Sequence, residues 1–404
     1  MEELKKHKLG DLCVFQEGYV NPSQGIAKYF NGNIKWIRAI DLNNGKVFNT
    51  TRTLTDEGFK SAGKSAMLFK PGTIVLSKSG TIGRLGLIQD FMCGNRATIN
   101  IAPKNNTNIL YIFYNLLSRQ DEIANLAVGS VQKNLYVSIL EQMDIMLPSE
   151  SIQKKTVELL SSIDDKIEIN NRINHNLEEQ AQALYKSWFV DFEPFKDGKF
   201  VDSELGMIPE GWSVVPFLSL AKLCSGGTPK TDIKEFWNGN IPFFTPKDVK
   251  GSTFCLITEK TISEPGLNNC NSRLYSPYTI FITARGTVGK LCMAGIPMAM
   301  NQTNYAICPS ESIDPVVLYL ITKQLILKLQ NKANGAVFDA ITTRDFEGEY
   351  ILASTPSVLN KFAQIVRPIY ERILQNDKQT LALAQYRDAL LPQLMTGSLI
   401  TNNL

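Results

Sequence analysis

The feature that most constrains this chain is that its two halves repeat each other. The segment Lys70–Leu85 aligns with Ser276–Leu291 at a shift of 206 residues, which places Gly80-Thr81-Ile82-Gly83 over Gly286-Thr287-Val288-Gly289. The same shift pairs Asn95 with Asn301, Pro103 with Pro309, Gly129 with Gly335 and Val131 with Val337, and Asn31–Ile34 pairs with Asn238–Ile241 at 207. Chance does not produce a collinear series of this length, so we predict two tandem copies of one fold.

Each copy combines strand and helix patterns. Short β-branched and apolar runs at Thr73–Ser77 and Thr279–Thr283 end in glycine-rich turns and predict strands. Later in each copy, apolar residues recur at helical spacing over Leu110–Ala127 and Val316–Lys332. The expected fold class is therefore α/β (α+β), with one domain over residues 1–150 and another over residues 211–356.

A long helical pattern follows each domain, with seam residues at alternating steps of three and four, as in a heptad repeat. Pro148-Ser149 and Pro356-Ser357 are start signals for helices over 151–190 and 357–397, and residues 191–210 are interpreted as a linker. Since single amphipathic helices are marginally stable, we expect the two to pack as an antiparallel coiled coil. The first seam is Leu160, Ile163, Ile167, Asn170, Asn174, Leu177, Ala181, Leu184 and Trp188, and the second is Val366, Ile369, Ile373, Asn376, Thr380, Leu383, Arg387 and Leu390.

Polar residues interrupt both seams. Asn170 and Asn174 come opposite Asn376 and Thr380 when the seams are placed in register. Buried amides cost stability but fix the alignment of paired helices. The alternative left open here is that these positions turn outward at a break in the seam. Arg387 also argues against a coiled coil that continues uninterrupted to the end of the second helix.

Composition excludes several classes of protein. The chain contains no apolar run long enough to cross a membrane, and its first residues are too polar for a signal peptide, which predicts a cytoplasmic location. Its seven cysteines lack any CxxC pair, so we expect free thiols rather than a zinc site or disulfides. The net charge of +3 is modest, so a nucleic-acid-binding face requires clustered cations or partner subunits.

Sequence signatures of enzymes are missing. There is no GxxxxGK[ST] loop, no G-x-G-x-x-G and no Asn/Asp-Pro-Pro-Tyr/Phe segment of the kind typical of amino-methyltransferases. We interpret Gly80–Gly83 and Gly286–Gly289 as tight turns after strands, with a backbone contact to phosphate as the alternative. A duplicated chain without such signatures is typical of a binding protein.

Several segments together resemble the specificity (S) subunits of Type I restriction–modification systems, over nearly the whole chain. In the first half Trp36–Leu42 resembles a family segment, whereas Gly18-Tyr19-Val20-Asn21-Pro22 departs from the expected Gly-Gly-Thr-Pro. In the second half the matching segments are Ser225–Lys230, Phe236–Phe243, Thr245–Val249, Ala284–Gly289 and Gln385–Gly397.

This resemblance implies that each domain recognises one half of a bipartite DNA target. It implies that the paired helices act as a spacer and as docking surfaces for two methyltransferase (M) subunits, which restriction/translocase (R) subunits can join. S-adenosylmethionine, ATP and magnesium are then expected only on those partners, and this chain is a recognition subunit with no catalytic residue, metal or cofactor of its own. A helix over 151–190 spans about 60 Å, or between one and two turns of duplex.

Candidate contacts come from basic and amide side chains near the glycine turns and from apolar residues on the helices. For each DNA candidate the alternative is a solvated surface charge, and for each apolar candidate it is the core of the helix pair. Arg96 and Gln302 follow the equivalent Asn95 and Asn301 yet differ in chemistry, as two readers of different half-sites require. The DNA candidates are Arg38, Lys78, Arg84, Arg96, Lys133, Lys230, Lys247, Arg285, Lys290 and Gln302, and the subunit-interface candidates are Tyr185, Trp188, Phe189, Phe192, Leu391 and Leu394.

Two other functions are weighed against this one. A self-sufficient restriction enzyme fragment or orphan methyltransferase requires the missing signatures. An adaptor built around a coiled coil, without a DNA role, does not require two large and diverged α/β repeats.

Overall fold

The computed structural model describes residues 4–104, 106–129, 133–285, 288–332 and 340–399. The chain divides into two compact units. The first contains residues 1–166 together with 383–404, and the second contains residues 167–382.

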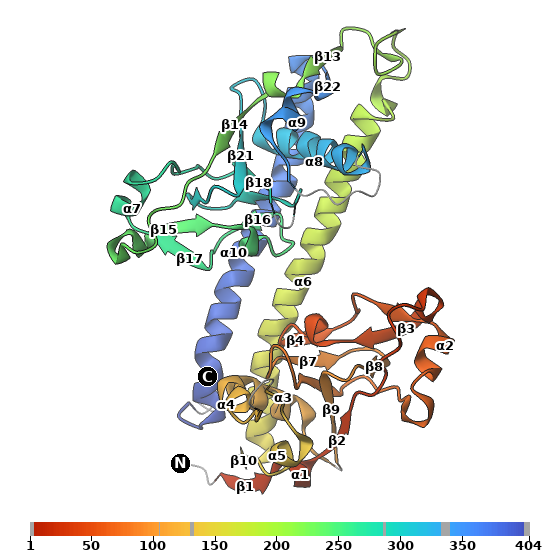
Figure 1. Cartoon of the computed structure of the whole chain (residues 1–404), viewed down its shortest axis with the longest axis vertical. Helices are drawn as coiled ribbons and strands as arrows, with labels where there is room; N and C mark the ends of the chain where they lie inside the picture. Colours follow the sequence, from red (N-terminus) through yellow and green to blue (C-terminus); the bar gives the residue numbers. More distant parts are fainter. Residues whose placement is uncertain (1–3, 105, 130–132, 286–287, 333–339, 400–404) are drawn as a thin grey trace. The chain divides into compact units, whose positions relative to one another are not determined.

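The first unit is built on one large and one small sheet (Figure 1). Neighbouring strands of the large sheet are antiparallel except for a parallel pair at one edge, between β7 and β4. The large sheet has the order β2 (Cys13–Glu17), β9 (Thr98–Pro103), β6 (Ile74–Ser77), β7 (Leu85–Ile88) and β4 (Gly45–Val47), and the small one β5 (Thr53–Leu54), β3 (Phe30–Ile37) and β8 (Met92–Gly94). A further pair joins β1 (Lys5–Lys8) to β10 (Asp144–Leu147).

The second unit repeats this topology strand for strand. Its large sheet has the order β14 (Ala221–Ser225), β21 (Asn304–Pro309), β18 (Ile280–Thr283), β19 (Leu291–Ala294) and β16 (Phe254–Cys255), and its small one β17 (Lys260–Ile262), β15 (Trp237–Phe244) and β20 (Ala299–Met300). β13 (Ser213–Pro216) pairs with β22 (Tyr350–Ala353), as β1 pairs with β10. The second unit has in addition a short pair of β11 (Phe200–Val201) and β12 (Ile208–Pro209). Even the register is repeated, because Ile74 pairs with Ile101 and Ile280 pairs with Ile307. The predicted tandem repeat of an α/β domain is confirmed.

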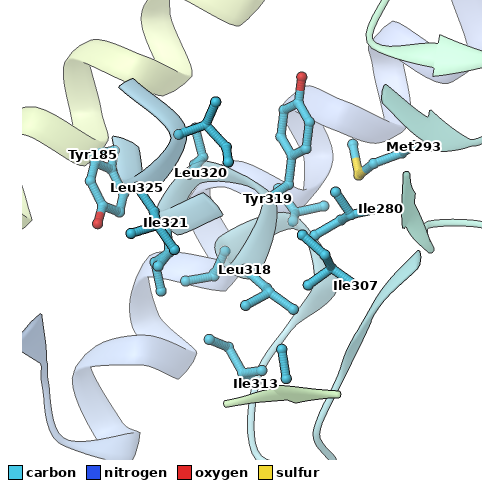
Figure 2. Packing of buried hydrophobic residues seen from close by; sticks show 14 of the residues in the cluster. Tyr185, Ile280, Met293, Ile307, Ile313, Leu318, Tyr319, Leu320, Ile321 and Leu325 are labelled. Atoms are coloured by element: carbon cyan, nitrogen blue, oxygen red, sulfur yellow. The ribbon is translucent and has the colours of Figure 1, made fainter. Parts of the chain in front are cut away.

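The central strands are continuous apolar runs because both faces of the sheet are covered. All four residues of β18 are buried, and the same is true of β6. In Figure 2, Ile280 and Ile307 of the large sheet lie against Leu318 and Tyr319 of α8 (Pro315–Lys332), all of them at most 3% exposed.

The corresponding helix in the first unit differs from its prediction. The sequence predicts a single helix over 110–127, but the structure has α3 (Ile109–Ser118) followed by α4 (Gln120–Asn125). Arg119 separates them with φ of −119°, outside the helical range. Its guanidinium donates to the carbonyl of Asp144 at 2.7 Å, a tertiary contact that no local pattern encodes.

The two long helices are α6 (Glu150–Phe189) and α10 (Pro356–Met395), each of 40 residues. The start signal of α10 was assigned one residue too late. Thr355 accepts a hydrogen bond from the backbone of Val358 at 3.4 Å, which makes Thr355 the N-cap and Pro356 the first helical residue. Proline suits that position because the first helical N–H has no partner within the helix.

Within the second unit the two helices run antiparallel. Asn170 donates to Gln379 at 2.9 Å, Asn174 donates to Asp377 at 2.7 Å, and the rings of Phe189 and Phe362 lie 4.8 Å apart. Residues further along α6 thus contact residues earlier in α10, which is the antiparallel arrangement. Asn170 is fully buried, so the alternative in which the seam amides turn outward is wrong.

Within the first unit, the charge of Arg387 at its seam position is compensated by an ion pair. Its Nη1 lies 2.7 Å from Oδ1 of Asp164, and both side chains are less than a fifth exposed. Tyr114 donates to the other Asp164 oxygen at 2.7 Å. The apolar seam is therefore replaced here by a buried polar cluster, as expected from the position of Arg387. No helix among the described residues is long and apolar enough to span a membrane.

Candidate nucleic-acid interface

In the first unit four loops meet at one edge of the two sheets. Three backbone hydrogen bonds connect them. The N–H of Asn95 donates to the carbonyl of Ile37 at 3.1 Å, that of Lys78 to the carbonyl of Ala97 at 2.8 Å, and that of Gly18 to the carbonyl of Thr98 at 2.9 Å. These bonds bring together Arg38, Lys78, Arg96 and the loop that starts at Gly18. We call this group the first edge.

Arg38 is the most firmly held side chain of the first edge. It follows β3, and its guanidinium carbon lies 5.3 Å from the ring centroid of Trp36. Its Nη2 donates to Oγ1 of Thr51 at 2.5 Å, and its Nε lies 3.7 Å from the carboxylate of Asp41. The side chain is 24% exposed, so it is anchored by the domain and still reachable.

Lys78 differs from Arg38 because its charge is already matched. Its Nζ lies 2.5 Å from Glu17, and the two side chains are only 17% and 25% exposed. A lysine that is already paired with a carboxylate is a weaker phosphate contact than an unpaired lysine. The structure therefore weakens the prediction that Lys78 contacts DNA. The pairing residue, Glu17, was not singled out from the sequence.

The remaining cations predicted to contact DNA in the first unit are exposed. Arg96 lies on the first edge, and the segment at Lys133 reaches it through a hydrogen bond from Leu135 N–H to the Lys78 carbonyl at 2.9 Å. Arg84 lies at the end of the β6–β7 turn, where its N–H donates to Ser77 Oγ at 2.9 Å. Gly80 and Gly83 both have positive φ there, which confirms the interpretation of this segment as a tight turn after a strand.

The second unit builds the same edge with different side chains. The N–H of Asn301 donates to the carbonyl of Phe244 at 3.0 Å, and the N–H of Ala284 donates to the carbonyl of Thr303 at 3.0 Å. Asn95 and Lys78 make the equivalent bonds in the first unit. The positions of Arg38, Lys78 and Arg96 are therefore occupied by Thr245, Ala284 and Gln302. The strand register likewise places Ser225 where the first unit has Glu17. We call these four residues the second edge.

The predicted DNA contacts of the second unit are all exposed. Gln302 belongs to the second edge and accepts a hydrogen bond from Thr228. Lys247 lies 3.8 Å from Glu259, Arg285 follows Ala284, and Lys290 takes the place of Arg84, with its N–H donating to Thr283 at 3.0 Å. Lys230 lies in the loop after β14, where its carbonyl accepts from Trp237 at 3.1 Å. Gly286 and Thr287 of the second glycine turn lie outside the described residues.

Most of the apolar side chains predicted to dock partner subunits are used inside the chain. Tyr185 and Phe189 are 8% and 7% exposed and pack on Phe362, and Leu391 and Leu394 are each 4% exposed. Buried side chains of this kind offer a partner little surface, so the structure favours the alternative that these four form the core of the helix pair. Trp188 and Phe192 are half-buried against Phe362 and Trp212, and remain partly accessible.

Reactive chemistry has little support in the described part of the chain. No group of three or more His, Cys, Asp or Glu residues there is arranged to hold a metal ion. Burial raises the pKa of the Cys13, Cys93 and Cys255 thiols to about 12, so they stay protonated near neutral pH and are poor nucleophiles.

Comparison with known proteins agrees with the tandem repeat. The model of a family described as Type I restriction modification DNA specificity domain matches residues 1–179 and 209–361. The chain is 31% identical to the Type I restriction enzyme MjaIX specificity subunit of Methanocaldococcus jannaschii, over 96% of this chain and 91% of that protein. It is 24% identical to the HindI specificity subunit of Haemophilus influenzae, over 99% and 100%. It also shares its fold with a Type I S subunit from M. genitalium, with a TM-score of 0.57, 16% identity and coverage of 97% and 96%.

Proposed function

Because this chain belongs to the family of Type I restriction–modification specificity subunits, we propose that it reads a bipartite DNA target with one half-site for each unit. The observation that carries this proposal is the pair of edges. The same backbone hydrogen bonds hold Arg38, Lys78 and Arg96 in one unit, and Thr245, Ala284 and Gln302 in the other.

A split target needs two different readers on related frameworks. Contacts to phosphate position a protein on DNA, whereas contacts to base edges distinguish sequences. The first edge offers two arginines and a lysine paired with Glu17, and the second offers a hydroxyl, a methyl group and an amide. Two such surfaces favour different bases, so the two half-sites are expected to differ in sequence.

The partners follow from the same family. We propose that methyltransferase and restriction subunits bind this chain, and that S-adenosylmethionine, ATP and magnesium act on those partners. In this proposal the chain itself is a non-catalytic recognition subunit located in the cytoplasm. The missing enzyme signatures of the sequence support this division.

The docking surface is proposed on the outer faces of α6 and α10 rather than on the buried aromatic residues. Ile169 is 47% exposed, Ile365 41% and Tyr386 54%, so these apolar side chains of the helices are accessible to a partner. Trp188 and Phe192 remain candidates at the end of α6.

Mapping methylated adenines in the source genome, before and after deletion of this chain, tests the proposal. We expect methylation to disappear at one bipartite sequence and to return when the chain is restored. Gel-shift experiments with and without the methyltransferase partner then separate a DNA reader from an adaptor without a DNA role. An unchanged methylation pattern, or methyl transfer by the isolated chain, contradicts the proposal.

A further inference from the structure

We propose that Arg38 is the specificity-determining residue with which the first unit reads a guanine. This inference rests on the proposed function and adds the residue and the base. The domain holds this side chain more firmly than the other cations predicted to contact DNA in the same unit.

The surroundings of Arg38 are rigid. Trp36, on which the guanidinium stacks, is 2% exposed, and its indole N–H donates to the carbonyl of Val20 at 2.8 Å. Asp41 is held as firmly, because its carboxylate accepts from the N–H groups of Arg38 and Thr51 at 2.9 and 2.8 Å. Thr51 in turn holds Nη2 of Arg38. An arginine held this way has already lost much of the side-chain freedom that binding would otherwise cost.

The donors that remain match a guanine edge. Nε of Arg38 is buried, and Nη2 uses one hydrogen on Thr51. Among the described residues Nη1 has no hydrogen-bond partner, so both of its hydrogens and the second Nη2 hydrogen are left for a ligand. Guanine presents two acceptors, O6 and N7, in the major groove, and a bidentate arginine is the commonest group to contact them.

The second unit shows that the turn itself does not need an arginine. Thr245 occupies the equivalent position, and its N–H donates to Asp248 at 2.7 Å, as that of Arg38 donates to Asp41 at 2.9 Å. The same capping arrangement thus forms with a threonine. The hydroxyl of Thr245 also donates to Asp248, at 2.8 Å, and completes the turn without a cation. The turn therefore does not require a guanidinium, and Arg38 adds hydrogen-bond donors that the second edge lacks at this position.

The other cations predicted to contact DNA in this unit provide a contrast. Arg84 and Arg96 are exposed, and Lys78 is neutralised by Glu17. Exposed and flexible cations suit phosphate, where the position of the charge matters more than the orientation of the donors. Arg84 is therefore a matched control for Arg38, with the same side chain in the same unit but without the anchoring.

The experiment uses the full chain in complex with its methyltransferase partner and a duplex carrying the target found by methylation mapping. Each guanine of the two half-sites is replaced in turn by 7-deazaguanine, which lacks the N7 acceptor. For the natural complex we expect one replacement in one half-site to weaken binding by about 2- to 10-fold, because loss of N7 removes one of the two hydrogen bonds of a bidentate contact worth roughly 1–3 kcal/mol. In Arg38→Ala that replacement is expected to have no further effect, whereas replacements in the other half-site keep their natural effects.

Arg84→Ala is expected to weaken binding to all duplexes alike and to lower the salt dependence. Arg38→Lys keeps the positive charge but loses the two parallel N–H donors of the guanidinium, so it is expected to lose the guanine preference as Arg38→Ala does. This second variant provides the test if the alanine variant does not fold. The inference is overturned if Arg38→Ala behaves like Arg84→Ala, if 7-deazaguanine weakens binding to the variant as much as to the natural complex, or if neither half-site contains a sensitive guanine. Absence of any bipartite target for the natural complex instead overturns the proposed function.

Discussion

At the residue scale, the polar side chains between the long helices of the second unit form a connected chain. Asn376 donates to Asn174 at 2.8 Å, and Asn174 donates to one oxygen of Asp377 at 2.7 Å. The other Asp377 oxygen is buried without a hydrogen-bond partner among the described residues. These contacts favour one register of the helices but leave a carboxylate poorly solvated, since burial raises the pKa of Asp377 from 3.8 to about 6.

The raised pKa predicts a pH dependence of stability. The folded state holds a proton on Asp377 below pH 6, whereas the unfolded chain releases it above about pH 4, so stability decreases as the pH rises through this window. We expect Asp377→Asn to remove this penalty and stabilise the protein at pH 7 to 8 by about 1 kcal/mol, allowing for partial exposure. Denaturant unfolding of both proteins from pH 4.5 to 8 measures the difference, and two parallel profiles would contradict the prediction.

At the element scale, α6 and α10 are matched in length at 40 residues each, and their seam positions face each other within each unit. Asn170 meets Thr380 at 3.4 Å in the second unit, and Asp164 meets Arg387 at 2.7 Å in the first. Two paired helices of equal length suit a spacer, because the paired rod becomes longer only when both helices are extended by the same number of residues.

We predict that seven residues inserted into both helices, next to Asn170 and next to Thr380, lengthen the unspecified gap in the DNA target. Seven residues preserve the heptad seam and add about 10 Å, which corresponds to roughly three base pairs. Both half-site sequences are expected to stay the same, with weaker binding because the half-sites are also rotated by about 100°. Methylome sequencing measures the gap. Insertion into α6 alone is the control and is expected to abolish methylation, whereas an unchanged gap in the active double insertion shows that the helices do not set the spacing.

At the scale of the whole molecule, each unit has its own sheets, its own core and its own edge. The second unit buries Ile280, Phe346 and Phe362, each fully, in a cluster that contains no residue of the first unit. Independent cores are the physical basis of modular function, because one domain can change without unfolding the other.

We predict that exchanging residues 1–150 for the equivalent part of another specificity subunit changes only one half of the methylated sequence. The second edge, with Thr245, Ala284 and Gln302, is untouched by this exchange. The hybrid should keep a tyrosine at the position of Tyr114, because Tyr114 donates a hydrogen bond to Asp164 of α6. This preserves the polar contact between the exchanged domain and α6. Methylome sequencing of the hybrid tests the prediction, and a change in both half-sites, or in neither, means that the units do not read one half-site each.

The sequence by itself determined the tandem repeat and the two long helices, whereas the burial of Asn170 and Asn376 in the seam was decided by the structure. The repeat and the helices depend on periodicity and self-similarity, which a linear chain displays directly. Only the tertiary structure decided the roles of individual side chains. Lys78 is neutralised by Glu17, 61 residues away, and Tyr185 is buried against Phe362. Arg38 is anchored by Thr51, 13 residues away on the neighbouring segment. Exposure and pairing depend on which distant segments meet, and no local pattern of residues encodes that.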